Sequence, residues 1–292
     1  MGTWIAIQSK SCSHTSFVLH LEKKTGKKRK QKKLKEQNDK EVVELALLAG
    51  HILLENGAEI FRVEETMERI CAHFGVESAS EFVLSNGIFV TVGNERENVF
   101  AKVQHIPVSG THLDKVAAVN QLSREISRDV YTVPEAMKKL EEIQNMPGKS
   151  TWVQILASGV GSAAFCFLFG GNFRDSMAAF VAGFVLYIYV LGAGAHLSKI
   201  VTNILGGALV TVICGGFYLC GLGQHLNFMI VGSIMPLVPG VAFTNAIRDV
   251  ADADYISGMV RMLDALLVFF CVAAGVGFGI SIMSRLTGGA LL

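Results

Sequence analysis

The chain has 292 residues, of which 51% are hydrophobic and 17% charged, and its formal net charge is +1. These averages hide two different halves, because residues 1–150 carry most of the charge and only ten Asp, Arg and Lys side chains follow Thr151. The second half is therefore expected to be a membrane domain and the first a soluble one, which excludes a wholly soluble protein.

A strongly basic segment lies near the N-terminus, where nine of the thirteen residues from Lys23 to Lys35 are Lys or Arg. Such a segment buries too little apolar surface to fold alone, so residues 1–40 are predicted to form a disordered tail. Beside a membrane domain the expected partner is the anionic surface of a lipid bilayer, and no nucleic acid is expected. A solvated tail without any partner fits the composition equally well.

Residues 41–148 are predicted to form an α+β domain. Apolar residues first recur at helical spacing until Asn56-Gly57 supplies a stop, and a second helix is expected over 60–74. Two further helices, expected over 112–128 and 134–144, close the domain, and the later one starts with a proline in its first turn.

Between these pairs of helices the apolar residues alternate with a period of two. Phe82 alternates with Leu84, and a second alternating run starts at Ile88. This pattern predicts two or three antiparallel strands joined by tight turns at Asn86-Gly87 and Gly93-Asn94.

The polar residues of this domain do not form a recognised chemical motif. Glu59, in the Gly57-Ala58-Glu59 turn, lies at an element boundary, where capping and turn chemistry accounts for it. The histidines lack HExxH spacing and a neighbouring carboxylate pattern, so no metal and no other cofactor is expected. These histidines are His51, His73, His105 and His112.

Four uncharged runs after residue 148 are long enough to cross a bilayer. A hydrocarbon core about 30 Å thick needs about 20 helical residues, so the longest run must hold two spans and the total is five. The runs are Val153–Phe173, Ser176–Ala195, Ile200–Ile247 and Ala265–Ser284. Residues 149–292 are thus predicted to form a five-span transmembrane domain.

Lysine and arginine favour cytoplasmic loops. If the first domain is cytoplasmic, most of the basic loop residues lie inside, and Arg174 and Arg285 lie outside. The expected fold is therefore a mainly α-helical integral membrane protein, with five transmembrane helices preceded by a cytosolic α+β domain and with a cytoplasmic N-terminus.

Two prolines interrupt the fourth predicted span. Pro236 and Pro239 lack amide hydrogens and disfavour helical geometry in the preceding residue, so the helix should break near the bilayer midplane. A second half-helix starting near Gly240 would present free amides and a positive dipole end to a carboxylate group of a solute. Because broken backbone at this depth is costly unless it lines a cavity, Ser233–Asp264 is the candidate transport site.

Polar residues follow the break. Asn245, Arg248, Asp249 and Asp252 are spaced i, i+3, i+4 and i+7, so they are expected to share one helix face. Arg248 can hold an anion as a bidentate donor, and Asp249 or Asp264 could carry a proton if burial raises its pKa. The same residues also fit a proline-kinked helix with an ordinary charged loop, and Arg261 with Asp264 then forms a plain interfacial ion pair.

At these residues the sequence resembles the threonine/serine exporters. The characteristic stretch is Pro236-Leu237-Val238-Pro239-Gly240, then Asn245-Ala246-Ile247-Arg248-Asp249, then Asp254 and Ser257-Gly258. Gly57-Ala58-Glu59 with Arg62-Val63-Glu64 is similar to the N-terminal signature of that family. The similarity covers about residues 42–285.

The resemblance implies a bacterial cytoplasmic-membrane protein associated with export of threonine, serine or, in some two-component members, succinate. Single-chain members carry more spans than the five predicted here, so the chain is similar to the larger, N-terminal half of the split systems. The expected partner is then a small membrane subunit with the remaining spans, and the chain could also form a homo-oligomer.

The expected function is membrane transport rather than catalysis: a subunit of a proton-coupled exporter of small amino acids or carboxylates. A membrane-anchored hydrolase acting through the N-terminal domain is one alternative, but neither G-x-S-x-G nor H-E-x-x-H is present to supply a nucleophile and base. A regulatory protein that binds a small ligand in the same domain and gates the spans is the other.

Overall fold

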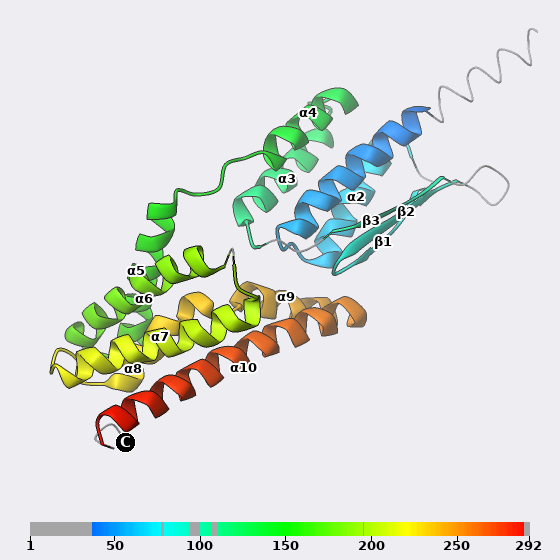
Figure 1. Cartoon of the computed structure of the whole chain (residues 1–292). Coiled ribbons are helices and arrows are strands. Elements are labelled where there is room, and N and C mark those ends of the chain that lie inside the picture. The colour runs from blue at the N-terminus through cyan, green and yellow to red at the C-terminus, as the bar shows by residue number, and fades with distance from the viewer. Residues whose placement is uncertain (1–36, 77–78, 94–99, 107–109, 195, 289–292) are drawn as a thin grey trace, which may run out of the picture. The chain divides into compact units, whose positions relative to one another are not determined.

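The structure of the chain, a computed structural model, describes residues 37–76, 79–93, 100–106, 110–194 and 196–288. It divides into two compact units, Met1–Asn145 and Met146–Leu292 (Figure 1). Each unit has its own hydrophobic core. The predicted basic tail lies outside the described residues as far as residue 36. Residues 37–40, which the prediction placed in the tail, are helical instead.

The first unit opens with two helices that meet at a glycine turn. The first helix covers residues 37–55, and α2 spans Ile60–His73. Between them Gly57 has a φ of +81°, a left-handed conformation that glycine adopts without steric cost. The amide of Ala58 donates to the carbonyl of Leu53, so the first helix ends at its predicted stop.

A three-stranded antiparallel sheet follows, in the order β1-β2-β3. Its strands are β1 (Ala79–Leu84), β2 (Gly87–Val92) and β3 (Phe100–His105). The residues Ser85 and Asn86 connect β1 to β2, so the predicted hairpin is confirmed. The other predicted turn, Gly93-Asn94, leads into residues 94–99, which lie outside the described residues.

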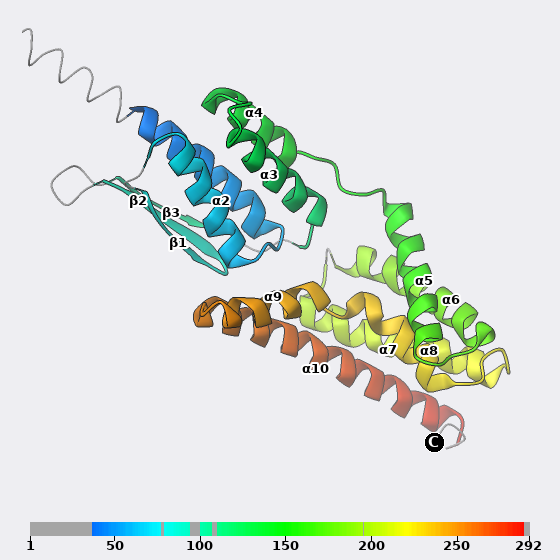
Figure 2. The ribbon, with the colours of Figure 1, turned by 180° about the vertical axis from the view of Figure 1, so that it is seen from behind.

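The helix at 37–55 and α2 lie against one face of the sheet (Figures 1 and 2). Val83, Ile88 and Val90 are buried on that face. Phe82, whose alternation marked the first strand, is exposed on the opposite face, where its ring lies 6.1 Å from that of Phe89. The buried residue of β1 is thus Val83, which the alternating pattern passed over.

Two helices complete the unit, α3 (Leu113–Ile126) and α4 (Val133–Gln144). Each end of these helices lies within two residues of its predicted position. α4 starts with a capping box, in which Oε2 of Glu135 accepts hydrogen bonds from the amide and the hydroxyl of Thr132. Pro134 occupies the first turn, where its missing amide hydrogen costs no helical bond.

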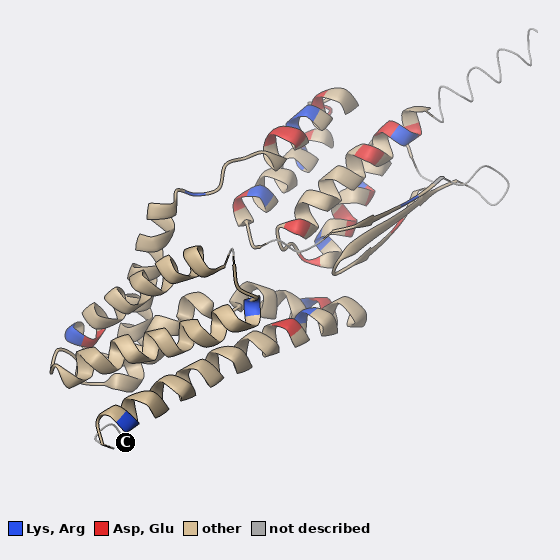
Figure 3. Cartoon of the chain, viewed as in Figure 1, with Lys and Arg blue, Asp and Glu red and all other residues tan. Residues whose placement is uncertain are grey.

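The second unit is helical in most of its described residues. Its segments are α5 (Thr151–Leu168), α6 (Phe173–Ala193), α7 (Lys199–Leu219), α8 (Leu226–Ile234), the 3₁₀ turn η1 (Met235–Leu237), α9 (Gly240–Ala251) and α10 (Tyr255–Leu286). Among the described residues, α5, α6, α7 and α10 are long and apolar enough to cross a membrane, and α8 with η1 and α9 makes a fifth crossing if the bent pair is one span. Charged residues lie mainly toward the ends of these segments (Figure 3).

The helices α7 and α10 run in the same direction and touch through glycines. Gly207 lies beside Gly275, and further along Gly215 lies beside Met283. A Cβ on Gly275 would overlap the carbonyl oxygen of Ile204. Small residues at such positions let two helix backbones approach closely inside a membrane.

Gly275→Ala is therefore expected to destabilise the second unit by about 1–3 kcal/mol, because the added methyl group must push α7 and α10 apart. Gly277→Ala is the matched control, since a Cβ there meets no described atom within 4 Å and alanine favours the helix. Thermal unfolding of the full chain in detergent should show a lower Tm for the first variant and an unchanged or higher Tm for the second. Equal melting temperatures would contradict the close contact.

Candidate functional site

The break predicted in the fourth span is confirmed. α8 passes into η1, and after Val238 and Pro239 the chain starts α9 at Gly240. The two parts of the span are bent by 66°. The segment Leu226–Leu237 rises about 18 Å at 1.5 Å per helical residue, which is a little more than half the thickness of a hydrocarbon core about 30 Å thick.

The first half of the span, α8, is enclosed by α5, α6 and α7. Gly232 lies so close to α5 that a Cβ on it would be 2.7 Å from the Cα of Cys166. Oγ of the next residue, Ser233, lies 3.4 Å from the carbonyl oxygen of Ala179 on α6 and 3.7 Å from Sγ of Cys214 on α7. The backbone is thus held inside the bundle up to the break.

The polar residues after the break lie on α9 at the predicted helical spacing, but they differ in burial. Asp249 is 2% exposed and turns toward α10, whereas Arg248 is exposed and Asn245 is half-buried. Asp249 and Arg248 lie about 100° apart around the helix, at the two edges of this face, so the contact with α10 buries Asp249 and leaves Arg248 exposed.

Asp249 meets Arg261 at the contact between α9 and α10. Nη1 of Arg261 donates to Oδ2 of Asp249 at 2.9 Å, and the two side chains are 11% and 1% exposed. Gly258 permits this approach, because a Cβ there would lie 2.9 Å from the backbone nitrogen of Val250. The absence of a side chain at Gly258 therefore lets α9 come close enough to α10 for the short side chain of Asp249 to reach Arg261.

Asp264 has a different partner from the one that the alternative interpretation gave it. Its Oδ2 atom lies 2.6 Å from Nζ of Lys199 on α7, and both side chains are more than half exposed. Exposed ion pairs of this kind contribute about 0–1 kcal/mol. Arg261, which was paired with Asp264 in that interpretation, binds Asp249 instead.

One buried carboxylate was not predicted. Asp175 at the start of α6 is fully buried and accepts hydrogen bonds from the backbone amides of Asn172, Gln224 and His225, and its Oδ2 atom lies 2.8 Å from Nδ1 of His225. It joins the start of α6 to the loop that precedes α8. The Asn172-x-x-Asp175 spacing, a capping box, is the signal that could have found it.

The signature residues of the first unit form the corner between its first two helices. Glu59 directly precedes α2, and its carboxylate lies 3.8 Å from Nη2 of Arg62. A Cβ on Gly57 would lie 3.4 Å from Oγ1 of Thr111, so the segment before α3 covers the turn. These contacts fit the turn role that spacing alone suggested for Gly57 and Glu59.

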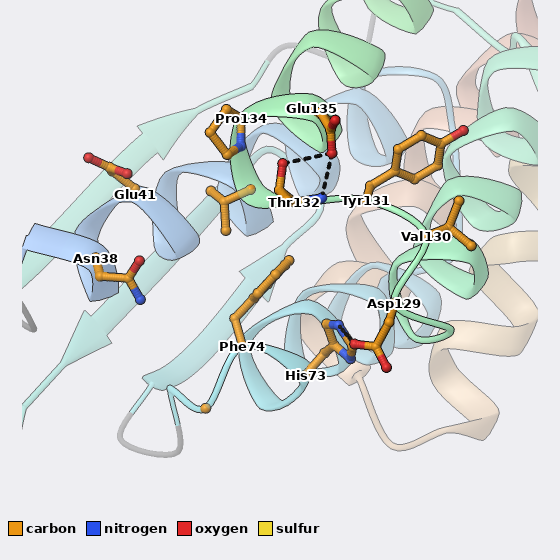
Figure 4. A pocket seen from close by; sticks show the side chains of 12 residues that line it. Asn38, Glu41, His73, Phe74, Asp129, Val130, Tyr131, Thr132, Pro134 and Glu135 are labelled. Carbon is orange, nitrogen blue, oxygen red and sulfur yellow. Dashed lines mark hydrogen bonds and ion pairs between the residues drawn. The ribbon is translucent and has the colours of Figure 1, made fainter.

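The first unit also contains a pocket of about 830 Å³ (Figure 4). It lies between the start of the first helix, the end of α2 and the turn before α4. Nε2 of His73 lies 3.3 Å from Oδ1 of Asp129 on its wall. The other side chains that give the pocket its chemistry are Asn38, Glu41, Phe74, Tyr131, Thr132 and Glu135.

Two residues of this unit that could act as nucleophiles, Cys71 and Thr132, are in unreactive surroundings. Burial, and after it the nearby Glu81 carboxylate, raises the pKa of the Cys71 thiol to about 12, so the thiol stays protonated at neutral pH and is a poor nucleophile. The hydroxyl of Thr132 donates to the capping Glu135. Across the described part of the chain, no three His, Cys, Asp or Glu side chains are grouped as metal ligands would be.

The sequence of the chain is similar to those of known membrane transport proteins. A family model described as "Putative threonine/serine exporter" matches residues 44–283. A threonine/serine exporter of Corynebacterium glutamicum is 26% identical over 252 residues, which are 82% of this chain and 51% of that protein. The "Probable succinate transporter subunit YjjP" of Escherichia coli is 24% identical over 250 residues, which are 84% of this chain and 96% of that protein.

A yeast protein is also similar, the "Pheromone-regulated membrane protein 10" of Debaryomyces hansenii, which is 23% identical over 233 residues. The match covers 77% of this chain and 23% of the yeast protein. The chain thus spans about half the length of the corynebacterial protein, and a smaller part of the yeast one. No solved structure matches the chain.

Arg261→Ala is expected to destabilise the second unit by about 3–5 kcal/mol, because it leaves the Asp249 charge buried without its arginine. Lys199→Ala, which breaks the exposed pair with Asp264, should cost about 1 kcal/mol at most. The thermal unfolding temperature in detergent distinguishes the two variants. The double variant Asp249→Asn/Arg261→Met should recover much of the loss, and equally small losses in both single variants would refute the buried pair.

Proposed function

The chain belongs to the threonine/serine exporter family, and on this basis we propose that it exports a small amino acid or carboxylate, of the threonine, serine or succinate type, across a bacterial cytoplasmic membrane. Membership of a family of membrane transport proteins favours transport over catalysis. The observation that carries the proposal is the broken span at Pro236–Gly240.

The break offers a place for a solute near the middle of the bilayer. Non-helical backbone at this depth is tolerated where it is buried in protein or lines a water-filled cavity. The amide of Gly240 donates to the carbonyl of Val238, and the next two amides of α9 lack acceptors within their own helix and form its positive dipole end, which suits a carboxylate. A Cβ on Gly240 would meet no described atom within 4 Å, so there is room beside the start of α9.

Arg248 and Asn245 supply further contacts to the solute in this proposal. Arg248 lies about two turns beyond Gly240, and its exposed guanidinium can bind a carboxylate through two parallel hydrogen bonds. The half-buried amide of Asn245 offers both donors and an acceptor. Pro236 and Pro239 shape the site by fixing where the helix ends and starts again.

Asp249 and Asp264 are proposed to couple export to the movement of protons. Protonation of Asp249 would remove the charge that Arg261 binds, and the contact between α9 and α10 would weaken. Asp264 would respond in the same way through its pair with Lys199, which joins α10 to α7. The buried pair then keeps the path closed, and a proton releases it.

The assembly and the orientation are also part of the proposal. A relative named as a transporter subunit is matched over nearly its whole length, which supports a second, small membrane subunit as the partner. A homo-oligomer is the alternative assembly. The Lys and Arg content of the loops favours a cytoplasmic position for the first unit and the N-terminus.

Uptake of labelled solutes by inside-out membrane vesicles tests the transport proposal. Vesicles from cells that make the full chain with a small membrane subunit of the family should accumulate threonine, serine or succinate, and a protonophore should abolish the uptake. Arg248→Ala should lower uptake at limiting solute roughly ten-fold or more, since a hydrogen bond to a charged group is lost. Arg285→Ala, which changes an exposed arginine at the end of α10, is the control. The proposal would be refuted if vesicles that contain the wild-type chain and a small membrane subunit took up none of the three solutes.

The pocket of the first unit favours a second role, the binding of a regulatory ligand. Its lining includes Glu41, Asp129 and Glu135 together with Phe74 and Tyr131. Carboxylates beside aromatic faces suit a small organic cation. Such a ligand would act on the transporter through the first unit, whereas the hydrolase alternative gains nothing from the protonated Cys71 or the capping Thr132.

Thermal unfolding of the full chain with lysine, choline or spermidine tests the regulatory role. A ligand that binds only the folded state at 100 times its Kd adds about 2.7 kcal/mol of stability, which raises the Tm. Glu41→Gln should reduce that rise, and Glu44→Gln, an exposed residue on the same helix outside the pocket, should not. An unchanged Tm with all three cations would exclude these ligands and the role assigned to the pocket.

A further inference from the structure

Two hydroxyl groups near the break are enclosed by protein and have no hydrogen-bond partner among the described residues. They are Oη of Tyr189 on α6 and Oγ1 of Thr202 on α7. Thr202 as a whole is 7% exposed. An enclosed hydroxyl without a partner is costly, about 1–3 kcal/mol, so native proteins rarely keep one without a reason.

Two nearby residues of the same types have hydroxyl groups that do form hydrogen bonds. Tyr187, two residues before Tyr189, donates from its hydroxyl to Oε1 of Gln154 at 2.8 Å. Thr211, on the same helix as Thr202, donates to the carbonyl of Gly207 four residues earlier at 2.9 Å. Bonding of this kind is the usual solution for a threonine inside a helix, and Thr202 does not adopt it.

Both residues lie beside the break of the fourth span. Thr202 is one helical turn before Gly206, so the two residues share a face of α7. A Cβ on Gly206 would lie 3.6 Å from Cε1 of Tyr189 and 3.1 Å from Cδ1 of Leu237. Leu237 is the last residue of η1, between the two prolines. Tyr189 and Thr202 therefore both lie near Gly206 and the interrupted backbone.

We propose that Tyr189 and Thr202 are solute contacts, the second polar wall of the path whose first wall is the start of α9. This proposal rests on the transport function proposed above. The two hydroxyls can each donate and accept, so they suit a small solute with hydroxyl or carboxylate oxygens, and the bound solute supplies the missing partners. They carry no charge, so they complement the positive end of α9 rather than compete with it.

Tyr189→Phe and Thr202→Val test this role because each removes an oxygen and keeps nearly the same volume. In the vesicle assay, each variant should raise the half-saturating concentration of the exported solute roughly three- to ten-fold, the loss of one neutral hydrogen bond. The Tm of each variant without solute should stay equal to that of the wild type or rise. Assays with threonine, serine and succinate show which kind of oxygen the hydroxyls bind.

Two control variants separate this role from a structural one. Ser162→Ala removes another enclosed hydroxyl that lacks a partner among the described residues, but this one lies between α5 and α6 beside Gly183, and the half-saturating concentration should not change. Tyr187→Phe removes a bonded hydroxyl and should lower the Tm.

The outcomes are distinct. Uptake by the wild type with unchanged half-saturation in both variants would overturn the solute contacts and leave the transport function standing. A lower Tm for Tyr189→Phe and Thr202→Val, similar to that of Tyr187→Phe, would also overturn them, because the hydroxyls would then be structural. Absence of uptake by the wild type would refute the transport function and the contacts together.

Discussion

The hydrocarbon core of a bilayer offers no hydrogen-bond partners to an interrupted backbone, and the second unit is arranged around such an interruption. α8 reaches the break inside a ring formed by α5, α6 and α7, with Gly232 and Ser233 in contact with backbone atoms of α5 and α6. Beyond Pro239 the chain turns by 66° and α9 lies along α10. The packing of α8 therefore supports the backbone where the helical hydrogen bonds stop.

The second half of the span depends on a different kind of contact. α9 approaches α10 closely at Gly258, and Asp249 and Arg261 meet there away from water. A buried ion pair adds little stability over a well-packed apolar contact, but the removal of one partner is costly. Such a contact is well suited to a part of the protein that must stay in one position until a charge changes, which is the property that proton coupling would require.

Local rules account for most of what could be predicted. Proline inside a helix removes a backbone hydrogen bond, so the break at Pro236 and Pro239 could be predicted, as could the hairpin at Asn86. Long-range contacts account for the rest. The burial of Asp249 depends on Arg261, twelve residues later, and the burial of Asp175 depends on amides about fifty residues away.

The hydrogen bonds of Asp175 have a mechanical consequence. They tie the start of α6 to the start of α8, while Gly232 and Ser233 hold the remainder of α8 against α5, α6 and α7. α5, α6, α7 and α8 are therefore held together by contacts that do not involve α9. A movement of α9 relative to them would change the torsion angles of Val238 and Pro239, and it would carry α10 with it unless the contacts of Asp249 and Gly258 were first released.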